Sequence, residues 1–261
     1  MMRSLWTGAT GMVAQQLNID VISNNLANVN TTGFKKSRAE FEDLMYQTMR
    51  MAGAITEGDN RLPVGIQVGM GTRPTAVHKF FTQGDFQNTG NTLDVAIEGD
   101  GFFQVDVNGE LMYTRAGSFK LNQDGTVVTA NGYILQPQFA VPAQTKTISI
   151  SSSGHMAAID AQGQELAGAE LPLYTFINPA GLDARGRNLY TPTQASGDAT
   201  EGVPGTDNVG TLAQGFLEMS NVEVVDEMVN MIVGQRAYEV NSKSIQTSDS
   251  MLGIAVQLKR S

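Results

Sequence analysis

Apolar residues at both ends of this chain recur at every seventh position, the spacing of a helix that packs lengthwise on another helix. At the N-terminal end the row is Leu5, Met12, Ile19 and Leu26. At the C-terminal end the row is Val224, Met231, Tyr238, Ile245 and Leu252. The two rows predict terminal helices that pair as a coiled-coil-like domain. Helical structure is expected over residues 1–50, broken at Asn30-Thr31-Thr32-Gly33, and over residues 217–260.

The predicted N-terminal helix is too weak to stand alone. Gly8 and Gly11 each destabilise a helix interior by about 1 kcal/mol relative to alanine. Burial of two or three large apolar side chains, at about 1.5–3 kcal/mol each, would offset both glycines. An isolated helix of this kind is marginal in water, so we expect it to need a partner.

The predicted C-terminal helix carries a second apolar row on a different face. Its members follow at alternating steps of four and three residues: Val233, Ala237, Val240, Ser244, Thr247, Met251, Ile254 and Leu258. Two rows on different faces require two neighbours. One neighbour can be the N-terminal helix of the same chain, and the other is most simply a second copy. We therefore predict polymerisation seams that contain Leu5, Met12, Ile19, Leu26, Val224, Met231, Tyr238, Ile245, Leu252, Val233, Val240, Met251 and Leu258.

Turn dipeptides divide the middle of the chain into short stretches in which apolar and polar residues alternate. Asn108-Gly109, Asp124-Gly125 and Asn131-Gly132 are of the type that closes β-hairpins. No helical pattern separates these stretches, which excludes a parallel α/β sheet. The predicted fold class is α+β. Its parts are an N-terminal helix over 1–35, a connecting segment over 36–70, an all-β domain over 71–210 and a C-terminal helix over 211–261.

Charge and residue usage exclude several classes of partner. A net charge of −9, with no basic cluster larger than Lys35-Lys36-Arg38, disfavours binding to nucleic acid or anionic lipid. No apolar run approaches the ~20 residues of a membrane span, so direct membrane insertion is not expected. Cysteine is absent, which excludes disulfides and cysteine metal ligands. Only 16% of the residues are charged, which suggests that another molecule covers part of the surface.

The sequence contains no arrangement typical of an enzyme. Gly99-Asp100-Gly101 leads into a predicted strand, whereas a phosphate loop needs its glycines before a helix. Asn122-Gln123-Asp124-Gly125 is similar to a calcium loop, but Asn131 stands where a glutamate ligand is needed. His78 and His155 have no nearby carboxylate in the sequence. We predict no catalytic, cofactor-binding or metal-binding residues.

Two further patterns leave alternatives open. Between Asn188 and Gln235 there is no Lys or Arg, while seven acids occur: Asp198, Glu201, Asp207, Glu218, Glu223, Asp226 and Glu227. We interpret them as a solvated acidic face, the last four near the start of the C-terminal helix, with a charged docking surface as the alternative. Methionines gather near the helical parts and fit core packing and an adaptable interface equally well: Met45, Met49, Met51, Met219, Met228 and Met231.

Three segments resemble the signatures of the flagellar rod and hook family. They cover residues 23–35, residues 94–105, and residues 220–222 together with 235–243, in the order found in that family. The residues that carry the terminal motifs are Asn24, Asn25, Leu26, Ala27, Asn28, Thr32, Gly33, Phe34, Arg236, Ala237 and Tyr238. The chain is too short for a hook protein, and residues 46–71 resemble a segment that distal rod subunits carry and hook proteins lack. The family associates that segment with a straight, stiff rod, although the chain departs from it in detail over Ala52–Arg61.

The resemblance implies a structural subunit of the distal rod of the bacterial flagellar basal body. Such subunits polymerise into a hollow helical tube that transmits torque and conducts exported subunits. The paired terminal helices would form its inner layer and the β domain its outer layer. Proximal rod subunits, hook subunits and ring bushing proteins would be the partners. The alternatives are a proximal rod subunit of the same family and a periplasmic β-rich carbohydrate-binding or adaptor protein.

The resemblance also changes the expected location. Gly8, Thr10 and Gly11 interrupt any signal-peptide core near the N-terminus, which taken alone predicts a cytoplasmic protein. Flagellar rod subunits instead leave through the flagellar type III export apparatus without a cleaved signal. The resemblance therefore implies a basal-body protein that spans the periplasm.

Overall fold

The computed structural model describes residues 2–53, 63–206 and 209–260. Two compact units make up the chain. The terminal unit comprises Met1–Leu26, Ser37–His78 and Glu223–Ser261, and the β unit comprises Ala27–Lys36 and Lys79–Val222. A helix at each end and a β-rich middle confirm the predicted α+β class.

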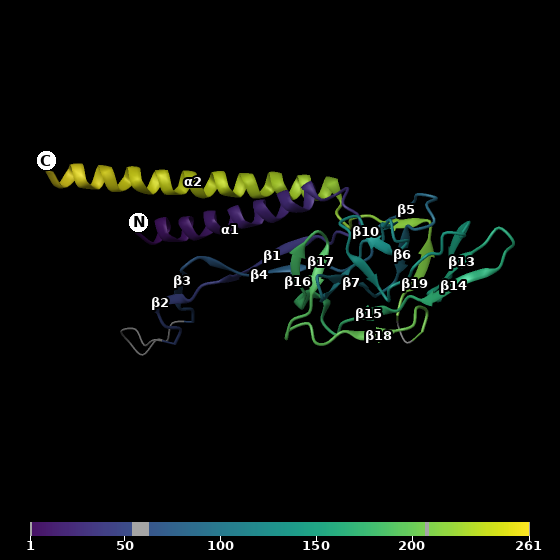
Figure 1. The fold of residues 1–261 in the computed structure, drawn as a ribbon. Coiled ribbons are helices and arrows are strands. Elements are labelled where there is room, and N and C mark those ends of the chain that lie inside the picture. The colour runs from purple at the N-terminus through teal and green to yellow at the C-terminus, as the bar shows by residue number, and fades with distance from the viewer. Residues whose placement is uncertain (1, 54–62, 207–208, 261) are drawn as a thin grey trace. The chain divides into compact units, whose positions relative to one another are not determined.

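Most of the elements are short strands (Figure 1). In chain order they are α1 (Met2–Ala27), β1 (Ser37–Asp43), β2 (Tyr46–Arg50), β3 (Ile66–Gly69), β4 (Thr72–Lys79), β5 (Phe86–Asn88), β6 (Val95–Glu98), β7 (Phe103–Val107), β8 (Glu110–Thr114), β9 (Phe119–Leu121), β10 (Val127–Thr129), β11 (Ile134–Gln136), β12 (Thr147–Ile150), β13 (His155–Ile159), β14 (Glu165–Glu170), β15 (Leu173–Thr175), the 3-10 helix η1 (Pro179–Gly181), β16 (Asp183–Gly186), β17 (Leu189–Thr191), β18 (Thr200–Gly202), β19 (Thr211–Gln214), β20 (Phe216–Glu218) and α2 (Val224–Arg260).

A seven-stranded sheet forms the centre of the β unit, in the order β16-β17-β8-β7-β11-β10-β9. Its neighbouring strands are antiparallel, and the predicted hairpins at Asn108-Gly109, Asp124-Gly125 and Asn131-Gly132 are all present. Each of these turns places a glycine at positive φ, a conformation that glycine adopts without steric cost. The inward face of β7 buries Phe103 and Val105 completely. They pack in one apolar core with residues of β6, β11, β13 and β15, which fixes the sheet against its neighbours.

A second cluster in the β unit is aromatic. Phe102, Phe176 and Tyr190 lie among its buried members. Phe102 contacts Phe176 edge to face, with the ring centroids 5.6 Å apart, and contacts Tyr190 at 6.0 Å. Such pairs add stability beyond the area that they bury. The β unit therefore has a complete interior of its own.

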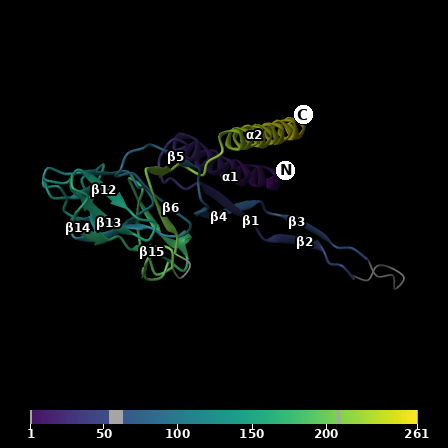
Figure 2. The ribbon, with the colours of Figure 1, turned by 90° about the vertical axis from the view of Figure 1, so that its right-hand side faces the viewer.

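In the terminal unit, α1 and α2 lie side by side and run in opposite directions, so that the two chain ends lie at the same end of the pair (Figures 1 and 2). Strands β1 and β4 form a two-stranded sheet, and β2 and β3 form another that extends from it as a ribbon (Figure 2). Neither helix, over the residues that the structure describes, is long and apolar enough to cross a membrane.

Two predicted helix boundaries are wrong. Residues 34–50 were expected to be helical but contain β1 and β2, because α1 ends at Ala27 and Gly33 then takes a left-handed φ of 69° that turns the chain away. The C-terminal helix begins at Val224 rather than at residue 217, because Phe216–Glu218 pairs with β5 as strand β20. A three-residue strand shows no period that sequence reasoning could detect.

Candidate assembly surface on the terminal helices

Contacts along the length of α1 and α2 define how the two helices pair. Near one end, Ser4 Oγ lies 3.1 Å from Ser248 Oγ, and near the other end Asn25 Nδ2 donates to Glu227 Oε2 at 3.2 Å. As the residue number rises along α1, that of its neighbour falls along α2, which is the pattern of an antiparallel pair. The side chains at both contacts are polar.

Glycines on α1 allow this close approach. A Cβ atom added at Gly8 would lie 3.0 Å from Ile245 Cγ1, and one added at Gly11 would lie 2.9 Å from Asn241 Nδ2. On α2, a Cβ atom at Gly234 would lie 3.2 Å from Ile19 Cγ1. From the sequence, the α1 glycines are expected only to destabilise the helix. Their neighbours on α2, Ile245 and Asn241, are larger residues, so no match of small residues between the two helices indicated this packing role in the sequence.

The heptad rows are only partly covered by this pairing. Leu5, Met12, Ile19 and Leu26 are all half-buried, as are Met231, Ile245 and Leu252. Val224 and Tyr238, at 39% and 40% exposed, lie at the edge. The structure therefore places most of this predicted seam beside the contact between the two helices of one chain.

The second predicted row lies on an uncovered face of α2. Val233 and Val240 are each 61% exposed, and Leu258 is 72% exposed. Met251 is also exposed, as are other apolar residues of the same helix: Val225, Met228, Val229, Ile232, Ile254 and Val256. We call the exposed residues that share one side of the helix the open face of α2: Val225, Met228, Val229, Ile232, Val233, Val240, Met251, Ile254 and Leu258. Ala237 of the second row is half-buried, and Val256 lies on the side of Ile245, so neither belongs to the open face. No described residue of the chain packs over it to a degree that would bury it.

The β2–β3 ribbon is exposed as well. Every residue of β2 is exposed. The large apolar side chains exposed to solvent along the ribbon are Met45, Tyr46, Met49, Met51, Val64 and Ile66. A lone two-stranded ribbon is at best marginally stable in water. Residues 54–62, which include most of the segment Ala52–Arg61, lie outside the described residues.

The N-terminal motif joins three elements of the terminal unit through Asn25, which is 1% exposed. Its Oδ1 accepts from Ser37 N at 2.9 Å, and its Nδ2 donates to Ser37 O at 2.8 Å as well as to Glu227. One side chain thus ties the end of α1 to the start of β1 and to the first turn of α2. Of its motif neighbours, Asn24 and Ala27 are exposed, while Leu26, Asn28 and Thr32 are half-buried.

The motif continues into the β unit at Gly33, Phe34 and Lys35. Gly33 has positive φ, and an added Cβ atom would lie 2.7 Å from Ala116 N, so only glycine fits there. Phe34 is 8% exposed, and Lys79 Nζ lies 5.5 Å from the centre of its ring. Lys35 is fully buried.

Lys35 belongs to a buried charged triad that sequence reasoning missed. Glu218 Oε1 accepts from Lys35 Nζ at 2.7 Å, and Glu218 Oε2 accepts from Arg115 Nε at 2.8 Å. Burial alone would raise the pKa of the Glu218 carboxyl, but Arg115 and Lys35 outweigh that effect and hold the pKa below its usual value. Burial, and then the charge of Arg115, lower the pKa of Lys35. No periodicity indicates that these three charges meet, since they come from distant parts of the chain.

The C-terminal motif lies on α2. Arg236 is exposed and donates to Glu239 Oε2 at 3.0 Å, one turn along the helix. Ala237 is half-buried and Tyr238 lies at the edge of the helix pair. This motif therefore presents one residue to the helix pair, one to its margin and one to solvent.

The acidic residues are less uniform than predicted. Glu218 is buried in β20 rather than solvated near the helix start, and Glu227 is buried against Asn25. The expectation that His155 lacks a carboxylate is also wrong, because its Nε2 lies 3.2 Å from Glu165 Oε1. Among the described residues no three His, Asp or Glu side chains gather closely enough to hold a metal ion. Asp207 lies outside the described residues.

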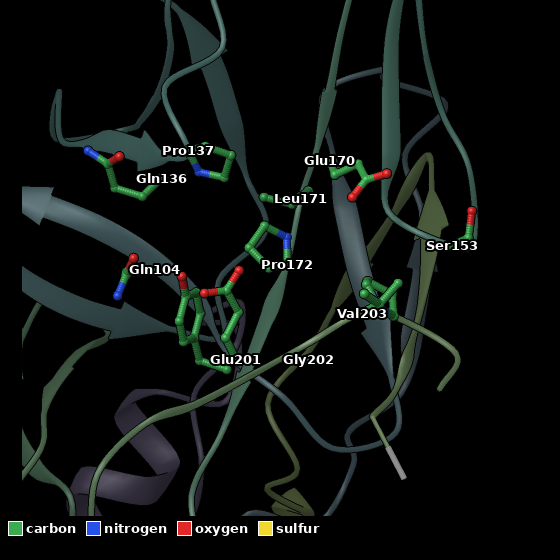
Figure 3. A pocket seen from close by; sticks show the side chains of 12 residues that line it. Gln104, Gln136, Pro137, Ser153, Glu170, Leu171, Pro172, Glu201, Gly202 and Val203 are labelled. Carbon is green, nitrogen blue, oxygen red and sulfur yellow. The ribbon is translucent and has the colours of Figure 1, made fainter. Parts of the chain in front are cut away.

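A cleft of about 460 Å³ lies in the β unit (Figure 3). Its lining includes Gln104, Gln136, Glu170, Glu201 and three prolines. The two carboxylates come from different strands, at the end of β14 and in β18. Tyr174 also lines the cleft, and burial together with the neighbouring Glu201 carboxylate raises the pKa of its hydroxyl.

Comparison with known proteins places the chain in a family. Three family models match it in order: the flagella basal body rod protein at residues 5–35, the flagellar hook protein FlgE/F/G D1 domain at 96–158, and the flagellar basal body rod FlgEFG protein C-terminal at 213–258. The flagellar basal-body rod protein FlgG of Borreliella burgdorferi is 51% identical over 264 residues, with all of both chains covered. The chain belongs to the FlgG family of flagellar basal-body rod proteins.

Other FlgG proteins are similar over nearly the same span. FlgG of Caulobacter vibrioides is 46% identical over 99% of this chain and all of the relative, and FlgG of Bacillus subtilis is 43% identical over the whole of both. The family consists of structural proteins of the rod and not of enzymes. Both terminal motifs named from the sequence fall inside the matched segments.

Proposed function

We propose that this flagellar rod protein is a subunit of the distal rod, where it polymerises with copies of itself into a hollow helical tube. The tube would transmit torque and conduct exported subunits. The observation that carries this proposal is the open face of α2, a row of large apolar side chains that the chain leaves uncovered. Large exposed apolar patches are typical of interaction surfaces.

A second copy of this chain is the simplest partner that would bury the open face. Each large apolar side chain that becomes buried contributes about 1.5–3 kcal/mol, so a few of them suffice to favour assembly. Contacts between two different surfaces of identical subunits do not close on themselves and generate a helical filament. The low proportion of charged residues, 16%, supports a chain whose surface is covered in its working state.

The antiparallel contact between α1 and α2 supports a coiled-coil-like inner layer for the tube. In this proposal α1 and α2 supply the inner layer and the β unit supplies the outer layer. Residues 211–222, predicted as part of the C-terminal helix segment, contain β19 and β20 and go with the β unit. The seam of Leu5, Met12, Ile19, Leu26, Val224, Met231, Tyr238, Ile245 and Leu252 then serves the helix pair and its margins. The open face serves the contact with the next subunit.

The exposed β2–β3 ribbon would add a second contact between subunits. Its apolar residues have nothing to cover them among the described residues, and a ribbon of two strands gains stability only by docking. We propose that it docks on neighbouring subunits and stiffens the rod. A proximal rod subunit would instead leave this ribbon out of such contacts, which distinguishes that alternative.

The names of the relatives support a place in the basal body. We propose that the subunit crosses the periplasm within the rod, after export without a cleaved signal peptide. Proximal rod subunits, hook subunits and ring bushing proteins would be its neighbours. A net charge of −9 argues against nucleic acid as a further partner.

The experiment that tests polymerisation is a charge placed on the open face. Val240→Asp should abolish filaments in electron microscopy of the concentrated protein, because an unpaired charge would be buried in the contact. Val203→Asp, at a valine of the β unit that is 52% exposed against 61% for Val240, is the matched control and should leave filaments intact. Filaments unchanged by Val240→Asp would contradict the role of the open face. Monomers or closed rings of the unchanged protein, with affinity for glycans, would favour the carbohydrate-binding alternative.

Ile245→Asp gives a complementary result. Ile245 faces Gly8, so an aspartate there would break the helix pair inside the chain and abolish polymerisation while the β unit stays folded. Amides of α1 (Met2–Ala27) and α2 (Val224–Arg260) should exchange faster than those of the β unit in the monomer and become protected on assembly, because much of the helix pair is buried only when neighbours are in place. Full protection in a verified monomer would contradict this account.

A further inference from the structure

Three segments of the β unit lie where the chain passes to and from the terminal unit. They are residues 33–36, residues 79–84 and residues 218–222, and each borders a point at which the chain changes unit. We call them the connector segments. All three are bonded to one another within the β unit, although they are far apart in the sequence.

Asn221 lies on the connector segment 218–222, and its side chain forms hydrogen bonds to both of the other connector segments. Its Oδ1 accepts from Lys36 N at 2.7 Å. Its Nδ2 donates to Phe80 O at 2.9 Å and to Thr82 O at 3.1 Å. Phe80 N also donates to Lys36 O at 2.9 Å, so the first two segments are bonded directly as well.

Glu218 makes a second set of bonds between the same segments. Its Oε1 accepts from Lys35 Nζ and, at 3.0 Å, from Gly84 N, while its backbone oxygen accepts from Gly33 N at 2.8 Å. Lys35 Nζ also donates to Thr82 O at 2.7 Å. Every segment is therefore held by at least one charged group.

Arg115, just after β8, anchors this arrangement to the body of the β unit. Its guanidinium donates to Glu218 and also to Gly101 O at 2.9 Å and Gly99 O at 2.5 Å. Lys35, Arg115 and Glu218 are each at most 2% exposed. The connectors are thus joined to the loop between β6 and β7 through buried charges.

We propose that Lys35, Glu218 and Asn221 form a clamp that holds the three connector segments on the β unit and carries the load that enters and leaves this unit in the rod. This role rests on the proposed function in torque transmission. A buried ion pair adds little to equilibrium stability, because its desolvation opposes its attraction. Pulling one partner out is nevertheless costly, since the other charge stays buried without compensation. A buried charged clamp therefore resists separation more than it stabilises the fold.

Hydrogen exchange of the full-length monomer, resolved to single amides, tests the clamp. Lys35→Met is informative because Arg115 and Glu218 remain as a balanced pair, so the β unit should keep its melting temperature. The amides of Gly33, Lys36, Phe80 and Gly84 should exchange about tenfold faster, as expected for loss of one charge-assisted hydrogen bond. Amides of β7 and β8 should be unchanged. Lys146→Met, at an exposed lysine of the β unit, is the control and should alter none of them.

Asn221→Ala should produce the same local change, with Asn131→Ala at an exposed turn as its control. Unchanged protection of the four amides in both Lys35→Met and Asn221→Ala would overturn the clamp. Faster exchange spread evenly over the core strands would also overturn the clamp, because it would show that the triad stabilises the β unit as a whole rather than holding the connector segments. The measurement uses the lone chain, so its outcome is independent of whether filaments form.

A second arm addresses load in cells. Cells whose rod carries Lys35→Met should swim normally in dilute medium but lose speed in a viscous medium, where torque is high. Equal speeds of these cells and of cells with Lys146→Met at every viscosity would contradict the load-bearing role, even if the local exchange is altered.

Discussion

The β unit covers its own large apolar side chains, whereas the terminal unit leaves most of its own exposed. Among the described residues, the buried hydrophobic side chains of the terminal unit are Ala14, Val21, Ile22 and Ala39. The exposed large hydrophobic side chains of the β unit are Phe86, Leu111, Leu121, Leu166, Ile177 and Val203, and all the others lie in the terminal unit. One chain thus contains a self-sufficient part and a part whose apolar surface is available to neighbours.

The difference follows from geometry rather than from composition. A sheet buries one face against another layer, and the β unit supplies both layers from its own strands. A pair of helices buries only the stripe along which they touch, and here that stripe combines glycine, serine and asparagine with Ile19 and Ile245. Many other large apolar residues of α2 lie outside this stripe and remain exposed. Folding of the β unit and assembly through the helices become separable events.

The largest effect should come from a cavity in the β unit. Phe103 is fully buried and contacts Phe119 edge to face at 5.2 Å. Phe103→Ala should lower the unfolding free energy of the β unit by about 3–5 kcal/mol, measured by denaturant unfolding. Leu111→Ala, on an exposed site of the same hairpin, is the control and should change it by less than about 0.5 kcal/mol. A small loss for Phe103→Ala would mean that the β unit also depends on neighbours.

Acid should weaken the β unit through Glu218. Its pKa lies below the ordinary 4.5 in the folded chain, so the unfolded chain binds the proton more readily. The stabilisation is fully present above about pH 4.5 and is lost as the pH falls through the folded pKa. Unfolding free energies measured between pH 7 and pH 3 should show this loss. It should disappear in Glu218→Gln and persist in Glu165→Gln, whose exposed pair with His155 contributes little.

A smaller effect is expected where the two helices meet. Gly8→Val would push a branched side chain into Ile245 and should destabilise the helix pair by about 1–3 kcal/mol. Gly253→Val on α2 is the matched control, since nothing lies within 4 Å of a Cβ atom there, and it should stabilise the helix slightly. Thermal unfolding followed by helical circular dichroism separates the two. Equal effects would show that α1 and α2 are not paired in solution.

Regular patterns were readable from the sequence, and charged contacts between distant segments were not. The hairpins were predicted correctly because each turn dipeptide and each alternation is local. The helix expected after the break, over residues 34–50, was wrong because β1 and β2 form by pairing with β4 and β3, and no local pattern indicates that pairing. The triad of Lys35, Arg115 and Glu218 was not predicted, because these residues are distant in the sequence. A charged residue is normally on the surface, and the sequence does not reveal the partners that allow burial.

The smallest effect on the lone chain should come from the open face of α2. Val233 is 61% exposed, so Val233→Ser should change the unfolding free energy by less than about 0.5 kcal/mol in denaturant titrations. The same substitution removes apolar surface that assembly would bury, so the concentration at which filaments appear should rise. Phe103→Ala should show the reverse pattern, with a large loss of stability and a surface for assembly that is unchanged. A Val233→Ser chain that unfolds more easily yet assembles normally would show that this side chain is buried within the lone chain. The terminal unit would then cover its apolar residues as the β unit does, and the contrast between the two units would be wrong.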